Sequence, residues 1–278
     1  MTLSVASLHI FPIKSLGGFG VKEAHITDRG FEHDRRWMLI DANGRFISQR
    51  EAAAMSCLHC SPFESGLRVT DLRDNDSIDL PWKLERGETQ RASVWSDEVN
   101  VRTAPVEVSA WFAEKLGITC ALAFMPEGTH RSVDPMYASG ITSLSDGFPY
   151  LIVSQASLDD LNARIASADA LIGPSAHPLP MDRFRPNIVI DGGTAFQEDG
   201  WKKITIGDAR FSLVKPCGRC IIPTIDQRTG ERGLEPTRTL ATFRRRVTET
   251  GAVKVEFGMN AMSHATTLIS AGAVIMPS

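Results

Sequence analysis

The first part of the chain consists of short runs of β-branched and aromatic residues, each bounded by Gly, Pro, Asn or Asp. Residues 5–11, 21–26 and 36–40 are the clearest of these runs. Runs of this length and composition are typical of strands, and the bounding residues are typical of turns. This pattern restricts residues 3–48 to a β structure.

One tight hairpin is predicted in this region. The runs 37–40 and 45–48 flank the sequence Asp41-Ala-Asn43-Gly44. An Asn-Gly pair supplies the positive φ that a short hairpin turn needs. Between residues 61 and 95 the chain is polar and rich in turn residues, which indicates short strands joined by loops.

The remaining segments add a few helices to this β framework. Residues 105–116 carry apolar side chains at helical spacing, and Gly117 is placed to end that helix. Ser157 is expected to cap a helix over 158–165, and another helix is expected from Thr237 to the arginine run 244–246, read as its solvated end. Further strands are predicted at 150–154, 187–190, 203–206, 209–215, 253–257 and 272–276, with a surface excursion at 166–180. The expected fold is mainly β with several helices, a β-rich α+β structure.

Composition limits the classes of partner. The 278 residues include 30 Lys plus Arg and 33 Asp plus Glu, a formal net charge of −3. Proteins that coat nucleic acid or anionic membranes carry a large basic excess, so we expect neither partner. No secretory signal is visible, and polar residues interrupt the longest uncharged stretch, 257–278. We therefore expect a folded cytoplasmic protein with no membrane span, whose five cysteines are reduced.

Four of the five cysteines form two Cys-x-x-Cys pairs, at 57/60 and 217/220. Four thiolates suit tetrahedral zinc, but the gap between the pairs is far longer than the ~12–20 residues of compact zinc modules. Cys57 and Cys60 follow a helix-like segment and are expected to be buried and inert. Cys217 and Cys220 follow a predicted strand beside Lys215 and Arg219, and nearby cations favour the reactive thiolate. A packed thiol at the strand end is an equal alternative for the second pair.

Three groups of cations also lie at strand ends. Lys14 and Ser15 precede a glycine-rich turn, a combination that can bind a phosphate, although a flexible hairpin loop is the simpler interpretation. Arg35 and Arg36 begin a strand, where alternating side chains turn one of them inward. Arg183 and Arg185 are spaced in the same way. An inward arginine needs an anion, so these groups together suggest an anionic ligand.

Four motifs in register carry a resemblance to a known family. They are Pro12-Ile-Lys-Ser15, Asp34-Arg-x-Trp37-x-x-Ile40, Phe184-Arg-Pro-Asn187, and Cys217-x-Arg-Cys220 followed by Pro223-Thr-x-Asp226-x-x-Thr-Gly230. In this order they resemble the MOSC-domain proteins. They are most similar to the branch that contains the mitochondrial amidoxime-reducing component and the bacterial hydroxylaminopurine reductases. The resemblance implies an N-terminal MOSC β-barrel domain over 1–117 and a MOSC domain over 118–278.

The resemblance also implies a molybdenum cofactor, molybdenum held by molybdopterin. By position Cys220 would be the metal ligand, and Gly218 stands where relatives often carry a hydroxyl residue, so only its backbone can contribute. The cofactor-binding positions implied by the match are Lys14, Ser15, Arg35, Arg185, Asn187, Gly218, Arg219 and Cys220. A molybdopterin phosphate brings about 1.5–2 negative charges, which require Lys or Arg partners when buried.

Other residues near these motifs keep two interpretations. Asp226 is either a turn former or a catalytic residue beside the metal, as a proton donor or a substrate anchor, with Cys220 as the other catalytic residue. Ser145-Asp146 and Gly258-Met-Asn260 resemble loops near the same site. His59 and His130 are more simply surface or satisfied core residues than ligands.

The function implied by the resemblance is a molybdenum-dependent oxidoreductase. It would remove oxygen, as water, from small N-hydroxylated compounds such as hydroxylamines, N-hydroxylated bases and amidoximes. The sequence lacks the four-cysteine spacing of an iron–sulfur cluster, so a separate ferredoxin or flavoprotein reductase is expected to supply electrons. One alternative is a non-catalytic carrier of the molybdenum cofactor or of sulfur. A dithiol oxidoreductase that uses Cys217 and Cys220 is a further alternative.

Overall fold

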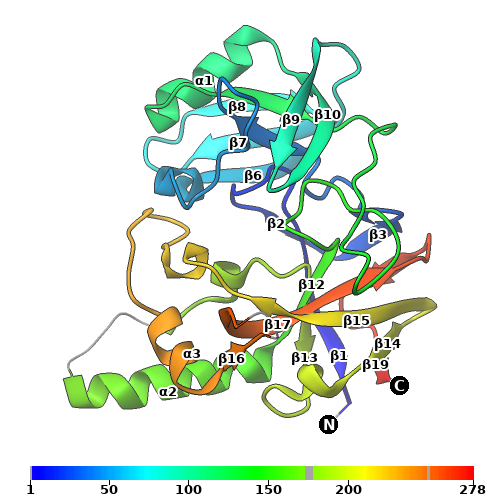
Figure 1. Cartoon of the computed structure of the whole chain (residues 1–278), viewed down its shortest axis with the longest axis vertical. Helices are drawn as coiled ribbons and strands as arrows, with labels where there is room; N and C mark the ends of the chain where they lie inside the picture. Colours follow the sequence, from blue (N-terminus) through cyan, green and yellow to red (C-terminus); the bar gives the residue numbers. More distant parts are fainter. Residues whose placement is uncertain (1, 173–177, 249–250) are drawn as a thin grey trace.

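The nine-stranded sheet is the largest element of the computed structural model, which describes residues 2–172, 178–248 and 251–278. Its strands pair antiparallel except for the parallel pair β12–β13. In spatial order they are β19 (Ile275–Pro277), β14 (Lys203–Ile206), β15 (Ala209–Gly218), β17 (Val253–Ser263), β12 (Tyr150–Ser154), β13 (Ile188–Asp191), β1 (Ser4–Ile10) and β2 (Phe19–Val21), while β16 (Arg245–Val247) pairs with β17. With the helices α2 (Gln155–Ile172) and α3 (Thr237–Phe243), this sheet forms what we call the large-sheet lobe, the lower half of Figure 1.

A second set of strands forms the small lobe, in the upper half of Figure 1. One sheet contains β5 (Trp37–Ile40), β11 (Ala121–Phe124), β10 (Asp97–Thr103) and β9 (Thr89–Val94), and another contains β6 (Leu58–Phe63), β7 (Gly66–Asp71) and β8 (Ser77–Pro81). The helix α1 (Val106–Leu116) packs on β11. A three-stranded sheet, separate from both lobes' main sheets, contains β18 (Leu268–Ser270), β3 (Glu23–Thr27) and β4 (Gly30–Phe31). Short 3₁₀ turns lie at η1 (Ala53–Cys57), η2 (Met181–Phe184), η3 (Gln197–Gly200) and η4 (Ile222–Thr224).

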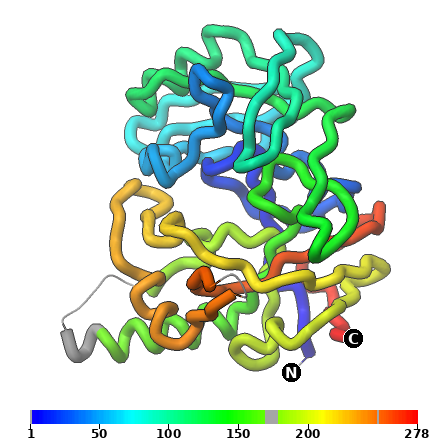
Figure 2. Tube along the Cα trace, viewed as in Figure 1, coloured from blue at the N-terminus to red at the C-terminus, as the bar shows by residue number. Residues whose placement is uncertain are grey.

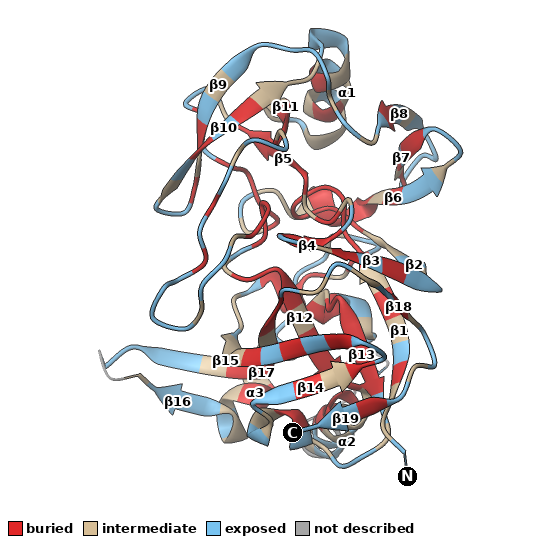
Figure 3. Ribbon diagram, turned by 90° about the vertical axis from the view of Figure 1, so that its right-hand side faces the viewer, coloured by how far each residue is buried: buried red, intermediate tan, exposed pale blue. Residues whose placement is uncertain are grey.

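Strand β5, next to the boundary between the lobes, is buried on both of its faces. All four of its residues are buried, with Trp37 and Leu39 in one apolar cluster and Met38 and Ile40 in another. Alternate residues of a strand point to opposite faces, so β5 has a core on both sides. In the large-sheet lobe, β12 and β13 are also mostly buried (Figure 3), with only Leu151 intermediate and Asp191 exposed.

The two ends of the chain meet in the large-sheet lobe (Figure 2). Ser4 forms a β-bridge with Val274, and the Val5 N–H donates to the Ala273 carbonyl at 2.9 Å. Strand β1 also pairs with β13, although the two are far apart in sequence. The proposed division between residues 117 and 118 remains a prediction. In the described part of the chain, no helix is long and apolar enough to cross a bilayer.

The predicted mainly β fold with several helices is confirmed, and so are its clearest local elements. The Gly44 N–H donates to the Asp41 carbonyl at 3.0 Å, and Gly44 has a φ of 77°. Asn43 is not among the positive-φ residues, so the glycine alone supplies that conformation. The second arm of the hairpin is reduced to the Ile40–Phe46 bridge. Helix α1 ends at Gly117, which has a φ of 66°.

Helix α2 begins at Gln155, earlier than the predicted 158–165. The hydroxyl of Ser154 accepts the N–H of Ser157 at 3.1 Å, whereas the Ser157 hydroxyl donates to the distant Glu198 at 2.8 Å. The cap therefore lies at Ser154, since a long-range partner engages Ser157. The predicted excursion at 166–180 is also wrong in its first part, because the helix continues to Ile172; residues 173–177 lie outside the described residues.

Two predictions near the C-terminus need correction. The arginine run 244–246 is not a helix end, because α3 stops at Phe243 and Arg245 and Arg246 pair with Val255 and Lys254 of β17. The strand predicted at 272–276 is shorter and later, at Ile275–Pro277, because a turn occupies its start and Gly272 has a φ of 83°.

Candidate functional site

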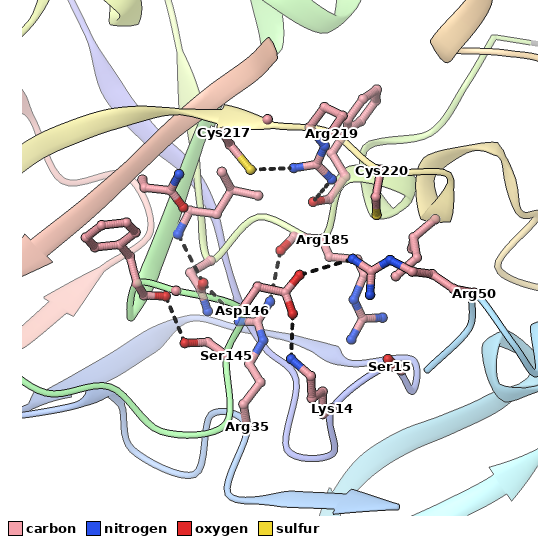
Figure 4. Close-up of a pocket in the computed structure, with 18 residues that line it drawn as sticks. Lys14, Ser15, Arg35, Arg50, Ser145, Asp146, Arg185, Cys217, Arg219 and Cys220 are labelled. Atoms are coloured by element: carbon pink, nitrogen blue, oxygen red, sulfur yellow. Dashed lines mark hydrogen bonds and ion pairs between the residues drawn. The ribbon is translucent and has the colours of Figure 1, made fainter. Parts of the chain in front are cut away.

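A pocket lies where segments of both lobes converge (Figure 4). It is bordered by the turn after β1, the segment before β5, the loop before β12, the η2–β13 connection and the loop after β15. Every cofactor-binding position suggested by the sequence lines it: Lys14, Ser15, Arg35, Arg185, Asn187, Gly218, Arg219 and Cys220. The structure thus brings eight residues from four distant motifs into one pocket.

A buried lysine marks one wall of the pocket. The backbone N–H of Lys14 donates to the Trp37 carbonyl at 2.7 Å, which aligns this turn with the start of β5. Its ammonium donates to the Leu144 carbonyl at 2.9 Å and to Asp146 Oδ1 at 2.5 Å. Burial lowers the pKa of Lys14, and the Asp146 carboxylate partly restores it.

Asp146 is the carboxylate of the pocket mouth, and its side chain is 60% exposed. A guanidinium nitrogen of Arg50 lies 3.6 Å from its second oxygen. Partial enclosure raises the pKa of Asp146, but the charge and hydrogen bond of Lys14 outweigh this effect and hold the pKa well below its usual range. Asp146 is therefore ionised at neutral pH.

Arg35 is held from three sides. Its guanidinium donates to Asp34 at 2.6 Å, to the Asn187 side-chain oxygen at 2.9 Å and to the Arg185 carbonyl at 3.2 Å. Asp34 is buried, and burial raises its pKa against the opposing effect of Arg35. The Asn187 amide also binds the Leu151 N–H at 3.2 Å and the His9 carbonyl at 3.2 Å. Asn187 thus anchors protein groups around the pocket.

Arg185 differs from Arg35 because no hydrogen bond or ion pair engages its guanidinium among the described residues. Burial, followed by the charge of Arg35, lowers its pKa to about 9. Arg185, Arg35 and Ser15 also have left-handed backbones, with φ of 56°, 47° and 68°. Such φ values are costly for residues other than glycine and cluster at functional sites. Three of the seven non-glycine residues with positive φ in the described chain therefore line this pocket.

The two cysteines of the second pair lie on the opposite wall. Gly218 pairs with Glu256 of β17, and the Arg219 N–H donates to the Val255 carbonyl at 2.7 Å, which fixes the loop to the sheet. The Arg219 guanidinium donates to Cys217 Sγ at 3.2 Å and to the Phe184 carbonyl at 2.9 Å. Figure 4 shows the Cys220 sulfur directed into the pocket. Cys217 is thus engaged by Arg219, while no hydrogen bond is recorded for the Cys220 thiol in the described residues.

Asp226 is not brought into the pocket. Its carboxylate accepts the N–H groups of Arg228 and Thr229 at 2.9 and 3.0 Å and pairs with Arg183 at 2.7 Å. It lines a different cavity, beside Glu231. The turn-forming interpretation accounts for the two backbone contacts, and the ion pair with Arg183 adds a long-range contact outside the pocket.

Of the other residues singled out in the sequence, Ser145, Asp146 and Asn260 line the pocket, whereas the remaining candidates lie elsewhere. Cys57 and Cys60 are buried as expected, and burial raises the pKa of Cys60 to about 12. His59 contacts the Gln227 carbonyl at 2.8 Å in a neighbouring cavity, and His130 is exposed. No cluster of three or more His, Cys, Asp or Glu side chains suited to a metal ion occurs in the ranges that the structure describes.

Sequence reasoning missed one cation of the pocket, Arg50. It follows the hairpin that carries Phe46, and its guanidinium lies 4.6 Å from the Trp95 ring centroid. No local pattern in the sequence distinguishes Arg50 from a surface arginine, because its place depends on the packing of three distant segments.

Comparisons with known proteins agree with this arrangement. Residues 2–119 match the family model of the MOSC N-terminal beta barrel domain, and residues 140–276 match the MOSC domain. The chain belongs to the MOSC family. The mitochondrial amidoxime-reducing component 1 of Mus musculus is 30% identical over 252 residues, covering 87% of this chain and 71% of the relative.

Molybdenum cofactor sulfurases match the same region of the chain. The Homo sapiens protein is 28% identical over 292 residues, covering 98% of this chain and 32% of its own length. The Oryza sativa subsp. japonica protein is 29% identical over 260 residues, covering 88% of this chain and 31% of its own length. The chain spans about a third of the length of these sulfurases. Its MOSC relatives therefore include proteins that handle the molybdenum cofactor.

Proposed function

We propose that this MOSC protein is a molybdenum-cofactor-dependent oxidoreductase that reduces N-hydroxylated compounds with electrons from a separate ferredoxin or flavoprotein. The observation that carries the proposal is the combination of an accessible thiol, Cys220, with a set of cations in one pocket. A thiolate suits molybdenum, and the cations suit a phosphate. The mouse relative, named as an amidoxime-reducing component, supports the substrate class.

The residues present fit such a cofactor. Lys14 is already paired with Asp146, and Arg35 is paired with Asp34, but the Arg185 guanidinium has no hydrogen-bond or ion-pair partner in the described chain. A half-buried cation without a counter-ion is unfavourable unless an anion occupies the site. The terminal phosphate of molybdopterin would supply that anion. Cys220 would hold the metal, and Gly218 would offer only its backbone.

When bound, the cofactor supplies two-electron chemistry that converts R–NHOH, two electrons and two protons into R–NH₂ and water. The chain's own residues would bind and orient the cofactor. Ionised Asp146 keeps Lys14 and Arg50 at the mouth, and Asn187 holds Arg35 by its amide oxygen. Cys217 would keep its contact with Arg219 and leave Cys220 as the thiol that faces the ligand. Asp226 is not assigned a proton-transfer role, because Arg183 and two backbone N–H groups occupy its carboxylate.

The first test is metal analysis on protein made in a host that synthesises the cofactor. We expect near-stoichiometric molybdenum in the parent chain and its loss in Cys220→Ser. Cys120→Ser is the matched control, because Cys120 is a partly buried free cysteine that lines a separate cavity. Molybdenum absent from the parent, or unchanged in Cys220→Ser, would contradict the assignment of the site.

The second test is turnover of the loaded protein with benzamidoxime and a chemically reduced viologen, which replaces the protein donor. We expect amidine formation by the parent and by Cys217→Ser, and none by Cys220→Ser. Loss of activity in both cysteine variants would instead favour dithiol chemistry, since thiol–disulfide exchange needs both thiols.

A second candidate function is a carrier of the molybdenum cofactor or of sulfur. The similarity to molybdenum cofactor sulfurases over nearly the whole of this chain favours it. A carrier would retain molybdenum but would not turn over any amidoxime or hydroxylamine with reduced viologen. The metal and turnover measurements together therefore separate the two functions.

A further inference from the structure

Phe11 brings the two arginines of the pocket onto one aromatic ring. The guanidinium carbon of Arg35 lies 4.5 Å from the Phe11 ring centroid, and that of Arg185 lies 4.4 Å from it. Both distances are within the range of a cation–π contact. Phe11 is 5% exposed and does not itself line the pocket. Any effect of this ring on a ligand there must therefore act through the arginines.

The backbone of Phe11 is fixed to the same group of residues. Its N–H donates to Asp34 Oδ1 at 2.8 Å, and its carbonyl accepts the Arg35 N–H at 2.8 Å. Arg35 in turn donates to the Arg185 carbonyl at 3.2 Å. Hydrogen bonds thus connect the Phe11 backbone, the Arg35 side chain and the Arg185 carbonyl, while the Arg185 guanidinium contacts this group through the Phe11 ring.

The glycine-rich turn makes room for this ring. A Cβ built at Gly18 would lie 2.5 Å from Phe11 Cδ1 and 2.3 Å from the Ile10 carbonyl oxygen. Neither distance is compatible with a side chain, so the turn packs its bare backbone against Phe11. The turn that the sequence suggested as a phosphate cradle therefore has a second role, as support for the ring.

An aromatic contact solves a specific problem in this pocket. Arg35 and Arg185 repel each other, and a carboxylate beside Arg185 would neutralise the charge that an anionic ligand needs. The negative face of a ring attracts a guanidinium without accepting its N–H groups. Phe11 can therefore hold Arg185 in place while its donors stay available.

We propose that Phe11 is a positioning residue that holds Arg35 and Arg185 on one ring as a binding site for a phosphate group. The identity of that phosphate as part of the molybdenum cofactor rests on the proposed function. Anion binding by the arginines does not depend on turnover, so it can be tested on the apoprotein.

The experiment is calorimetric titration of the cofactor-free full chain with inorganic phosphate at low and moderate salt. We expect Phe11→Leu, which keeps an apolar side chain but removes the π face, to weaken phosphate binding about tenfold. Phe11→Tyr keeps the π face and is expected to bind as the parent does. Phe112→Leu is the matched control: Phe112 is fully buried in the small lobe, and no cation contacts its ring among the described residues.

Two further measurements keep the outcomes distinct. Thermal unfolding of each variant reports packing loss, which we expect to be similar in Phe11→Leu and Phe112→Leu. Equal phosphate affinity in Phe11→Leu and the parent, equal weakening in both leucine variants, or no phosphate binding by the parent would overturn the proposal. Molybdenum content is measured in parallel. A parent that binds phosphate in a Phe11-dependent way but takes up no molybdenum would refute the proposed function and leave the positioning role intact.

Discussion

Asp146 is the residue that ties two cations of the pocket to one exposed carboxylate. Its folded-state pKa lies below the ordinary value of 3.8, so its ionised form stabilises the fold above that value. The contribution is lost as the pH falls through the folded-state pKa. The ion pair also offsets part of the cost of burying the Lys14 charge.

We predict that Asp146→Asn lowers the free energy of unfolding of the apoprotein by about 1 kcal/mol at neutral pH, a small value because the carboxylate is exposed. The difference from the parent should narrow as the pH falls below 3.8 toward the lower folded-state pKa, because the unfolded parent binds a proton at Asp146 in this range before the folded parent does. Urea unfolding across this pH range measures the difference in stability between the variant and the parent. Asp208→Asn, at an exposed turn without an ion pair in the described residues, should change nothing at either pH.

Arg185 offers a contrasting prediction. Its pKa falls from 12.5 to about 9 on folding, so the charged form disfavours the folded state below the folded-state pKa, and the penalty disappears only above the unfolded value. Arg185→Met should therefore stabilise the apoprotein by about 1 kcal/mol at neutral pH while lowering molybdenum content. Destabilisation together with normal molybdenum content would contradict this view.

The matched control for that prediction is Arg183→Met. Arg183 is buried two residues earlier, but Asp226 pairs with it at 2.7 Å. Removing it leaves the carboxylate without its partner, so this variant should lose stability and keep its molybdenum. Opposite changes in stability at these two arginines would distinguish a charge that serves a ligand from a charge that serves the fold.

Sequence reasoning located most of the pocket because the motifs preserve residue type and order. The eight expected binding positions converge on the pocket. Asp226 belongs to the same motif as Cys220, but it pairs with Arg183 outside the pocket. Arg50 and the anchoring role of Asn187 could not be found in this way. Asn187 contacts Arg35 at a separation of 152 residues, and Arg50 contacts Asp146 nearly a hundred residues away, and no local pattern encodes such contacts.

At the level of elements, the end of α1 is set by one glycine. Gly117 has a φ of 66°, and a Cβ there would meet no atom within 4 Å, so the cost of a side chain is backbone strain alone. We predict that Gly117→Ala lowers the free energy of unfolding by about 1 kcal/mol. Gly128→Ala is the control, because its surroundings are equally open and its φ is not in the left-handed region. Equal effects in the two variants, measured by urea unfolding, would rule out this explanation.

Elements with strong local signals were predicted well, and elements determined by distant partners were not. The 150–154 and 203–206 strands and the end of α1 agree with the structure because their apolar spacing and Gly117 are local. The short strand β16 forms because its backbone pairs with β17. Its sequence, two arginines followed by a valine, carries no local strand pattern. Similarly, Glu198 determines where Ser157 points and so where α2 is capped.

At the scale of the whole molecule, the strand order crosses the boundary that the sequence suggested. Strand β1 comes first in the chain but lies between β13 and β2 in the large sheet, and β3 pairs with β18 near the other end. The turn carrying Lys14 and Ser15 follows β1 and pairs with the start of β5 at the Ile13–Trp37 bridge, so it connects the two lobes. This connection explains how residues from both halves of the sequence line one pocket.

The distribution of the five cysteines leads to the last prediction. Cys57 and Cys60 are buried in the small lobe, Cys217 and Cys220 line the pocket, and Cys120 lies by itself beside another cavity. An iron–sulfur cluster needs four converging thiolates, and no such set forms within the described residues. Under the proposed function, we predict that this chain takes its electrons from a separate donor protein. The molybdenum-loaded chain should not reduce benzamidoxime with NADH alone, and it should gain activity when a ferredoxin and its NADPH-dependent reductase are added. Amidine formation at the full rate with NADH and the purified chain alone would show that this chain needs no donor protein.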